Sequence, residues 1–146
     1  MPKAAQRFFM AHRQRQASIS RRQAGLGASP HVDGYRVSGR FWIEKDGETY
    51  LAWGRIVLLD RIREHGSISA AARSMGMGYH HAWDLVDSMN RYAPEPLVQK
   101  TTGGKRGGGA RLTSAGEAAV AEFWDLVREF RTWLKGRRPR ACRRHK

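Results

Sequence analysis

The first regular pattern of hydrophobic and polar positions begins near Tyr35 and is that of a β-hairpin. Residues 36–45 and 48–51 are rich in β-branched and aromatic side chains, and the pair Asp46-Gly47 separates them. An Asp-Gly pair between two such runs favours a type I′ turn, because both central residues of that turn need a positive φ. The pattern therefore predicts a hairpin at the start of the folded region.

Apolar residues at helical spacing follow the hairpin directly. From about Gly54 onward, Ile56, Leu59 and Ile62 recur at three-residue steps. Gly66 stands where a helix would end in the left-handed conformation. We therefore expect a helix that ends at this glycine.

Two further helical patterns come next, separated by a glycine turn. Ser69 suits the N-cap of a short alanine-rich helix, and Gly76 suits a tight turn after it. A longer helix is expected over residues 79–92, before the helix-breaking Pro94 and Pro96. Its apolar face would hold Ala82, Leu85, Val86 and Met89.

Two β-prone runs, residues 97–101 and 111–113, flank a glycine-rich segment and predict the strands of a wing. The segment between them, residues 102–110, holds too many glycines for regular structure. Ser114 with Glu117 matches a capping box, which predicts the start of a final helix.

The final helix is expected to run from Ser114 to Leu134 with a narrow apolar seam. The seam residues are spaced by four and three positions in alternation, as in a coiled coil. They are Ala119, Phe123, Leu126, Phe130 and Trp133. Because soluble proteins rarely leave such a strip exposed, the seam predicts a homodimer formed through this helix.

The order of these elements predicts a mainly α fold with a small amount of β structure. We expect a winged helix-turn-helix domain over residues 33–134, with an N-terminal β-hairpin and a long C-terminal dimerisation helix. In this fold the second helix of the motif enters the major groove, and its N-terminal residues meet the base edges. The expected partner is double-stranded DNA.

Positive charge is concentrated at both ends of the chain. Among 146 residues, 27 are Lys or Arg and 13 are Asp or Glu, which gives a formal net charge of +14. Residues 1–32 and 135–146 contain no acidic residue, so nearly all of the excess lies there. We expect two basic, disordered arms that attract nucleic acid without reading its sequence. An Arg-rich, acid-poor N-terminus is also typical of an organelle transit peptide.

Composition excludes several other classes. No run approaches 18 consecutive apolar residues, so no membrane-spanning helix is expected. The single cysteine, Cys142, excludes an intrachain disulfide and a cysteine-built zinc site, and it favours a cytoplasmic location. The adjacent His80 and His81 would point about 100° apart on a helix, which is unsuited to joint metal binding. No metal or cofactor is therefore expected.

The residues of the predicted motif resemble a known family. Residues 66–73, with the sequence Gly-Ser-Ile-Ser-Ala-Ala-Ala-Arg, look like the helix-turn-helix entry of LysR-type regulators. Residues 79–90, with Ala-Trp-Asp and Met-Asn, and residues 102–113 resemble the recognition helix and wing of molybdate-responsive ModE regulators. The resemblance covers about residues 39–134 and implies a dimeric transcriptional regulator.

Two departures limit what the resemblance implies. Gly78 stands where the family usually has Ser at the start of the recognition helix, which removes one hydroxyl contact. Members that sense molybdate carry C-terminal oxyanion-binding domains, and this chain ends at Lys146. Molybdate binding is therefore not expected from this chain alone.

The candidate DNA-binding residues lie on the two helices of the motif and on the wing. They are Ser67, Ser69, Tyr79, His80, His81, Lys105, Arg106 and Arg111. The glycines around Lys105 and Arg106 would let the wing approach a phosphate or the minor groove closely. Trp83 is expected in the core, because a helical apolar stripe usually faces inward. Asp84 is expected to pair with Arg73.

Other functions fit the sequence less well. The glycine-rich segment fails the P-loop pattern, since Lys105 is followed by Arg106 rather than by Ser or Thr, and no enzyme is expected. Its backbone N–H groups could form an anion-binding nest, so a small oxyanion-binding module is one alternative. A non-specific nucleic-acid binder driven by the basic arms is the other.

Overall fold

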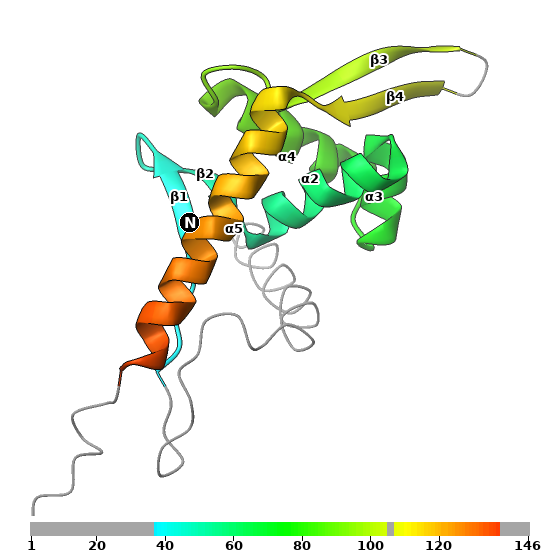
Figure 1. Cartoon of the computed structure of the whole chain (residues 1–146). Helices are drawn as coiled ribbons and strands as arrows, with labels where there is room; N and C mark the ends of the chain where they lie inside the picture. Colours follow the sequence, from blue (N-terminus) through cyan, green and yellow to red (C-terminus); the bar gives the residue numbers. More distant parts are fainter. Residues whose placement is uncertain (1–36, 105–106, 138–146) are drawn as a thin grey trace, which may run out of the picture. The chain divides into compact units, whose positions relative to one another are not determined.

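A computed structural model describes residues 37–104 and 107–137 of the chain, and these residues divide into two compact units. Phe41–Leu126 form the larger unit, shown with the rest of the chain in Figure 1. Residues 37–40 and 127–137 are the described part of the second unit. Arms were predicted at residues 1–32 and 135–146. Of these, only residues 135–137 are described, and Lys135 belongs to the last helix; the remainder lies outside the described residues.

The larger unit begins with the expected hairpin. Strands β1 (Trp42–Lys45) and β2 (Glu48–Ala52) pair antiparallel, with an irregularity between Ile43 and Glu44. At the turn, Asp46 has a φ of 54° and Gly47 a φ of 80°. Positive φ at both positions is the requirement of a type I′ turn, so the Asp-Gly prediction is confirmed.

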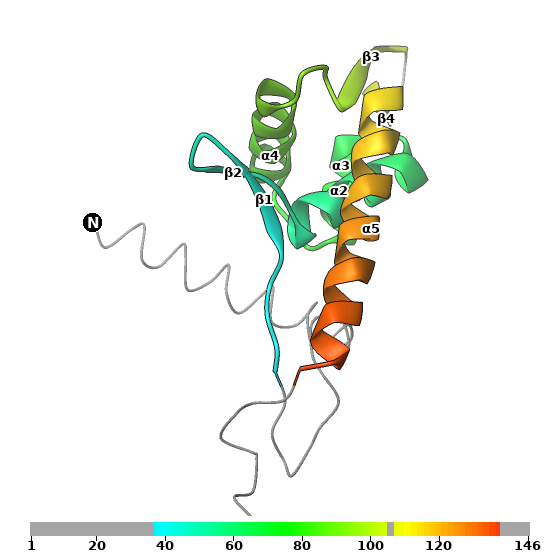
Figure 2. The ribbon, with the colours of Figure 1, turned by 60° about the vertical axis from the view of Figure 1, so that its left-hand side comes forward.

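Helix α2 (Trp53–His65) lies at the centre of the unit. It contacts β2, α3, α4 and β4, which surround it in Figure 1 and Figure 2. Its buried face consists of Ile56, Leu58, Leu59 and Ile62, all of them 0% exposed. The helix ends at Gly66, whose φ of 69° is the left-handed conformation predicted for it.

The helix-turn-helix consists of α3 (Ile68–Ser74) and α4 (Tyr79–Tyr92), joined through Gly76 with a φ of 62°. The prediction of Ser69 as the cap of α3 is wrong. Ser67 has the extended backbone of a cap, and its Oγ accepts a hydrogen bond of 3.1 Å from the N–H of Ala70. Helix α3 starts at Ile68, so Ser69 already lies in its first turn.

The wing is more regular than its composition suggests. Strands β3 (Val98–Gly104) and β4 (Gly107–Leu112) run antiparallel, and their ladder includes the pair Gly104 and Gly107. The expectation of an irregular segment over residues 102–110 is therefore wrong for all but residues 105–106, which lie outside the described part. Pairing with the opposite strand outweighs the low strand propensity of glycine.

The wing is followed directly by helix α5 (Ser114–Lys135). Its capping group is Thr113, whose Oγ1 accepts a hydrogen bond of 3.0 Å from the N–H of Gly116. The predicted capping box of Ser114 and Glu117 is wrong, because Glu117 instead accepts a hydrogen bond of 2.8 Å from Arg63. Within the described ranges, no helix is long and apolar enough to cross a membrane.

The apolar seam of α5 is divided between interior and surface. Ala119 and Phe123 are 8% and 0% exposed, and the Phe123 ring lies 5.4 Å from that of Phe41. The two residues thus belong to the core of a single chain, which corrects the expectation that the whole seam is exposed on a monomer. Leu126 and Phe130 are half-buried, and Trp133 is 53% exposed.

The start of α5 packs against the start of β3 with no space for a side chain at Gly116. A Cβ atom built there would lie 2.2 Å from the carbonyl oxygen of Leu97, which is a backbone atom. We expect Gly116→Ala to lower the free energy of unfolding by about 1–3 kcal/mol or more, measured by urea denaturation.

Gly136→Ala is the matched control for this substitution. The nearest atom to its Cβ would be a carbonyl oxygen at 3.8 Å, which is an ordinary contact. Equal stability losses for the two variants would contradict the proposed close packing at Gly116.

Candidate nucleic-acid interface

The N-terminal turn of α4 presents exposed polar and aromatic side chains. Tyr79 is 48% exposed, His80 is exposed, and their ring centroids lie 5.7 Å apart. His81 is half-buried. Gly78 caps the helix without a side-chain hydrogen bond, so the first N–H groups of α4 are not taken up by a cap. Such a helix start attracts phosphate.

The middle of the exposed face of α4 is acidic. Asp84 and Asp87 are both exposed, and Asp87 forms a weak pair with Arg91 at 3.9 Å. The expected pairing of Asp84 with Arg73 is wrong, because the ion pairs among the described residues do not include it. Arg73 instead donates a hydrogen bond of 3.3 Å to Ser69 within its own helix. Positive charge for a polyanion must therefore come from the elements beside α4.

Helix α3 supplies one such charge. Ser67 and Ser69 were predicted as DNA contacts. In the structure, both hydroxyl oxygens accept hydrogen bonds from their own helix-turn-helix motif. Arg73 is exposed and was not among the predicted residues. The four-residue spacing of Ser69 and Arg73 on a helix is the signal that could have identified it.

The wing supplies further charge. Arg111 is exposed and donates a hydrogen bond of 3.3 Å to Gln99 on the opposite strand. Lys105 and Arg106 lie outside the described residues, so their predicted contacts stay predictions. Lys100, which the sequence analysis missed, is exposed on β3.

Trp83 is not the core residue that its helical spacing predicted. Its side chain is half-buried, and Lys100 Nζ lies 3.5 Å from the centroid of its ring. Seventeen positions separate the two residues, so only the fold brings them together.

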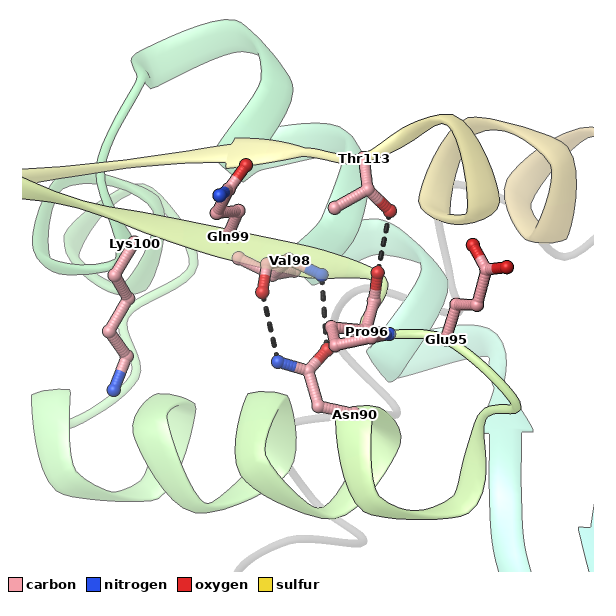
Figure 3. Close-up of a pocket in the computed structure, with 7 residues that line it drawn as sticks. All are labelled: Asn90, Glu95, Pro96, Val98, Gln99, Lys100 and Thr113. Carbon is pink, nitrogen blue, oxygen red and sulfur yellow. Dashed lines mark hydrogen bonds between the residues drawn. The ribbon is translucent and has the colours of Figure 1, made fainter.

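The end of α4 is joined to the wing by a single amide side chain. Asn90 Oδ1 accepts a hydrogen bond of 2.8 Å from the N–H of Leu97. Two more bonds join Asn90 to Val98 (Figure 3): Asn90 Oδ1 accepts one of 3.0 Å from the N–H, and Asn90 Nδ2 donates one of 2.9 Å to the carbonyl. Beside it, Thr113 Oγ1 donates a hydrogen bond of 2.6 Å to the carbonyl of Pro96.

These groups line an open depression of about 660 Å³. The Asn90 amide and the Thr113 hydroxyl are already bonded to the protein backbone (Figure 3), and the Gln99 amide oxygen accepts a hydrogen bond from Arg111. The polar groups of the depression therefore connect α4 to the wing, and their chemistry gives no reason to assign the depression a small ligand.

Clear pKa shifts occur at residues of β2 and α2. Burial raises the pKa of the Asp60 carboxyl and of the Tyr50 hydroxyl, and burial lowers the pKa of Arg55. A hydrogen bond to Glu117 raises the pKa of Arg63. In residues 37–104 and 107–137, no group of three or more His, Cys, Asp or Glu side chains is placed to hold a metal ion.

Replacing Asn90 tests the joint between α4 and the wing. Asn90→Leu removes three hydrogen bonds and leaves the N–H groups of two buried residues without this partner. We expect a loss of about 2–4 kcal/mol in the free energy of unfolding, since each buried unsatisfied group costs about 1–3 kcal/mol. Urea denaturation measures it.

Asn90→Asp is the informative control. Its carboxylate still accepts from both N–H groups, so the loss should be smaller than with leucine. Protonation at low pH restores a donor toward Val98, and the gap to the native protein should then narrow. A leucine variant as stable as the native protein would show that the joint is unimportant.

Comparison with known proteins supports a DNA-binding domain at this surface. Residues 53–117 match the model of the bacterial regulatory helix-turn-helix protein, lysR family. This range includes α2, the helix-turn-helix and the wing.

Several curated proteins are similar to the chain. The molybdenum transport protein ModE of Azotobacter vinelandii is 41% identical over 99 residues, which is 68% of this chain and 37% of that protein. The molybdenum-pterin-binding protein MopB of Rhodobacter capsulatus is 51% identical over 69 residues, or 47% of this chain and 26% of that protein.

A third relative is the DNA-binding transcriptional dual regulator ModE of Escherichia coli K12. It is 44% identical over 73 residues, or 50% of this chain and 28% of that protein. The chain thus spans well under half the length of the relatives that it matches. Over the matched region, the chain is similar to the helix-turn-helix domain of the lysR family and to ModE regulators.

Proposed function

We propose that this chain is a sequence-specific DNA-binding transcriptional regulator that acts as a homodimer. Helix α4 enters the major groove, and the wing contacts the backbone or the minor groove. The observation that carries the proposal is the exposed start of α4, where Tyr79 and His80 project from the second helix of the motif. A helix in the major groove meets base edges with the residues of this turn.

The dimensions of the motif support this docking. Helix α4 has 14 residues and is therefore about 21 Å long, and a major groove about 12 Å wide admits a helix lengthwise. The acidic Asp84 and Asp87 lie one and two turns further along the helix from His80. Phosphates repel these carboxylates, so the first turn of α4 is the part that can approach DNA most closely.

The names of the relatives support regulation more directly than they support metal chemistry in this chain. One relative is named a DNA-binding transcriptional dual regulator, and others are named for molybdenum transport or molybdenum-pterin binding. Because the match covers 26–37% of those three proteins, we propose DNA binding alone for this chain. We propose no catalytic role.

The homodimer is proposed through the C-terminal half of α5. Among the described residues, the large hydrophobic side chains with the greatest exposure are Trp42, Tyr79 and Trp133. Trp133 stacks on Phe130 at 6.0 Å with an interplanar angle of 15°, which makes a flat aromatic surface. Aromatic side chains of this kind are enriched at the centres of protein interfaces.

The basic ends of the chain have an accessory role in this proposal. Residues 1–32 and 135–146 would raise affinity for any DNA by counterion release, while α4 and the wing select the sequence. A regulator of this kind works in the cytoplasm, where the bacterial chromosome lies.

Removing the exposed side chains of the first turn of α4 tests base reading. We expect Tyr79→Ala and His80→Ala to reduce discrimination between selected and random duplexes by about 1–3 kcal/mol for each lost base contact. Competition binding with the full chain at fixed salt measures it.

Arg91→Ala is the control, because Arg91 lies in the last turn of the same helix and is also exposed to solvent. It should leave base preference unchanged. If all three variants keep the native preference, the first turn of α4 does not read the sequence.

The dimer surface is tested by placing a charge on it. We expect Trp133→Asp to give monomers in multi-angle light scattering, because a carboxylate would be buried at the interface. Trp42→Asp is the matched control, since Trp42 is 50% exposed on the hairpin, and it should stay dimeric. A Trp133→Asp variant that stays dimeric would show that the interface lies elsewhere.

A further inference from the structure

Lys100 occupies an unusual position on the wing. On an antiparallel hairpin, residues paired across the strands point to the same face, and Lys100 pairs with Ala110, which is 4% exposed. Val98, two residues earlier and on the same face, is 3% exposed. The inward face of the hairpin is thus apolar up to Lys100, where an aliphatic side chain would satisfy packing equally well.

The ammonium group of Lys100 lies against an aromatic ring. Its Nζ lies 3.5 Å from the ring centroid of Trp83, and Figure 3 shows the side chain reaching from β3 toward α4. Within the described part of the chain, no Asp or Glu forms a salt bridge with it. A cation–π contact orients the ammonium without cancelling its charge, and the exposed side of the group keeps donors for another acceptor.

The place of this pair matters for a protein that uses both α4 and the wing. A DNA backbone strand separates the major groove from the adjacent minor groove. If α4 occupies one groove and the wing lies against the next, that strand must cross the junction between α4 and β3. Trp83 on α4 and Lys100 on β3 meet at this junction.

We propose that Lys100 binds a phosphate of the DNA strand that separates the two grooves, and that Trp83 is the positioning residue that holds its ammonium there. The inference rests on the proposed function and extends it by naming the group that fixes the register of α4 and the wing on the backbone. Contacts of this kind position a protein on DNA without carrying sequence information.

The first test removes the charge and keeps the aliphatic stem. With the full chain and a duplex obtained by in vitro selection, Lys100→Met should reduce the slope of log K against log salt by about 0.9. Base preference should be unchanged, and Lys100→Arg should retain the native slope. Lys45→Met is the matched control, since Lys45 Nζ lies against the carbonyl of Tyr92 at the far end of α4.

The second test locates the phosphate. Single methylphosphonate substitutions along the duplex remove one backbone charge at a time. One methylphosphonate on the strand between the grooves should weaken DNA binding by the native protein. The same methylphosphonate should not weaken binding by Lys100→Met any further. With Trp83→Leu that substitution should weaken binding less than it does with the native protein, because the ammonium is no longer held in place.

The outcomes distinguish failure of the proposed function from failure of the Lys100 phosphate contact. If the native chain binds selected and random duplexes alike, the proposed function is wrong and this inference falls with it. If the native chain is selective but Lys100→Met has the native salt slope, only the phosphate contact is wrong. The same holds if every methylphosphonate weakens binding by Lys100→Met as much as it weakens binding by the native chain. If Trp83→Leu, checked for folding by circular dichroism, behaves as the native chain, Trp83 is not the positioning residue.

Discussion

The fold depends on satisfying the backbone at the base of a sheet that has only two strands. Strand β3 pairs with β4 on one edge, and no strand in the described part of the chain lies beside its other edge, yet Leu97 and Val98 are buried there. Asn90 supplies from α4 two acceptor contacts and one donor, which are the bonds that a third strand would supply. One amide thereby removes the cost of unpaired buried backbone groups and fixes the end of α4 against the wing.

Other contacts at the same place make the base of the wing rigid from several directions. The N–H of Ala110 donates a hydrogen bond of 2.8 Å to the carbonyl of Gly66 at the end of α2, and the N–H of Thr113 donates one of 3.0 Å to Leu97. The parts that the proposed function assigns to different grooves are therefore held in one geometry. A protein that reads one groove while bracing on the next needs such a fixed angle, because base contacts tolerate little displacement.

Local signals in the sequence were sufficient to predict the helices and strands, but they were insufficient to predict the helix caps and the contacts between elements. The periodic apolar residues and Gly66 gave α2 and α4 close to their observed bounds, since both signals act within a few residues. The cap at Ser67 was missed because Ser67 and Ser69 both suit a cap, and the sequence does not show at which residue the helix begins. The cap at Thr113 was missed because its hydroxyl also donates a hydrogen bond to the carbonyl of Pro96, 17 residues away in the sequence. Helical spacing placed Phe123 in an apolar seam, but it did not show that the ring of Phe41 packs against it. Lys100 and Trp83 meet through the fold alone.

The closeness of β4 to the end of α2 limits how this wing can diversify. A Cβ atom at Gly109 would lie 2.5 Å from Thr101 Oγ1 and 3.2 Å from the carbonyl of Gly66, so a side chain there would require both neighbours to shift. The hairpin can lengthen beyond its last described pair, Gly104 and Gly107, where each added pair of opposed residues extends a hairpin by about 3.4 Å. The reach of the wing along a duplex can thus evolve in discrete steps, independently of the helix that it accompanies.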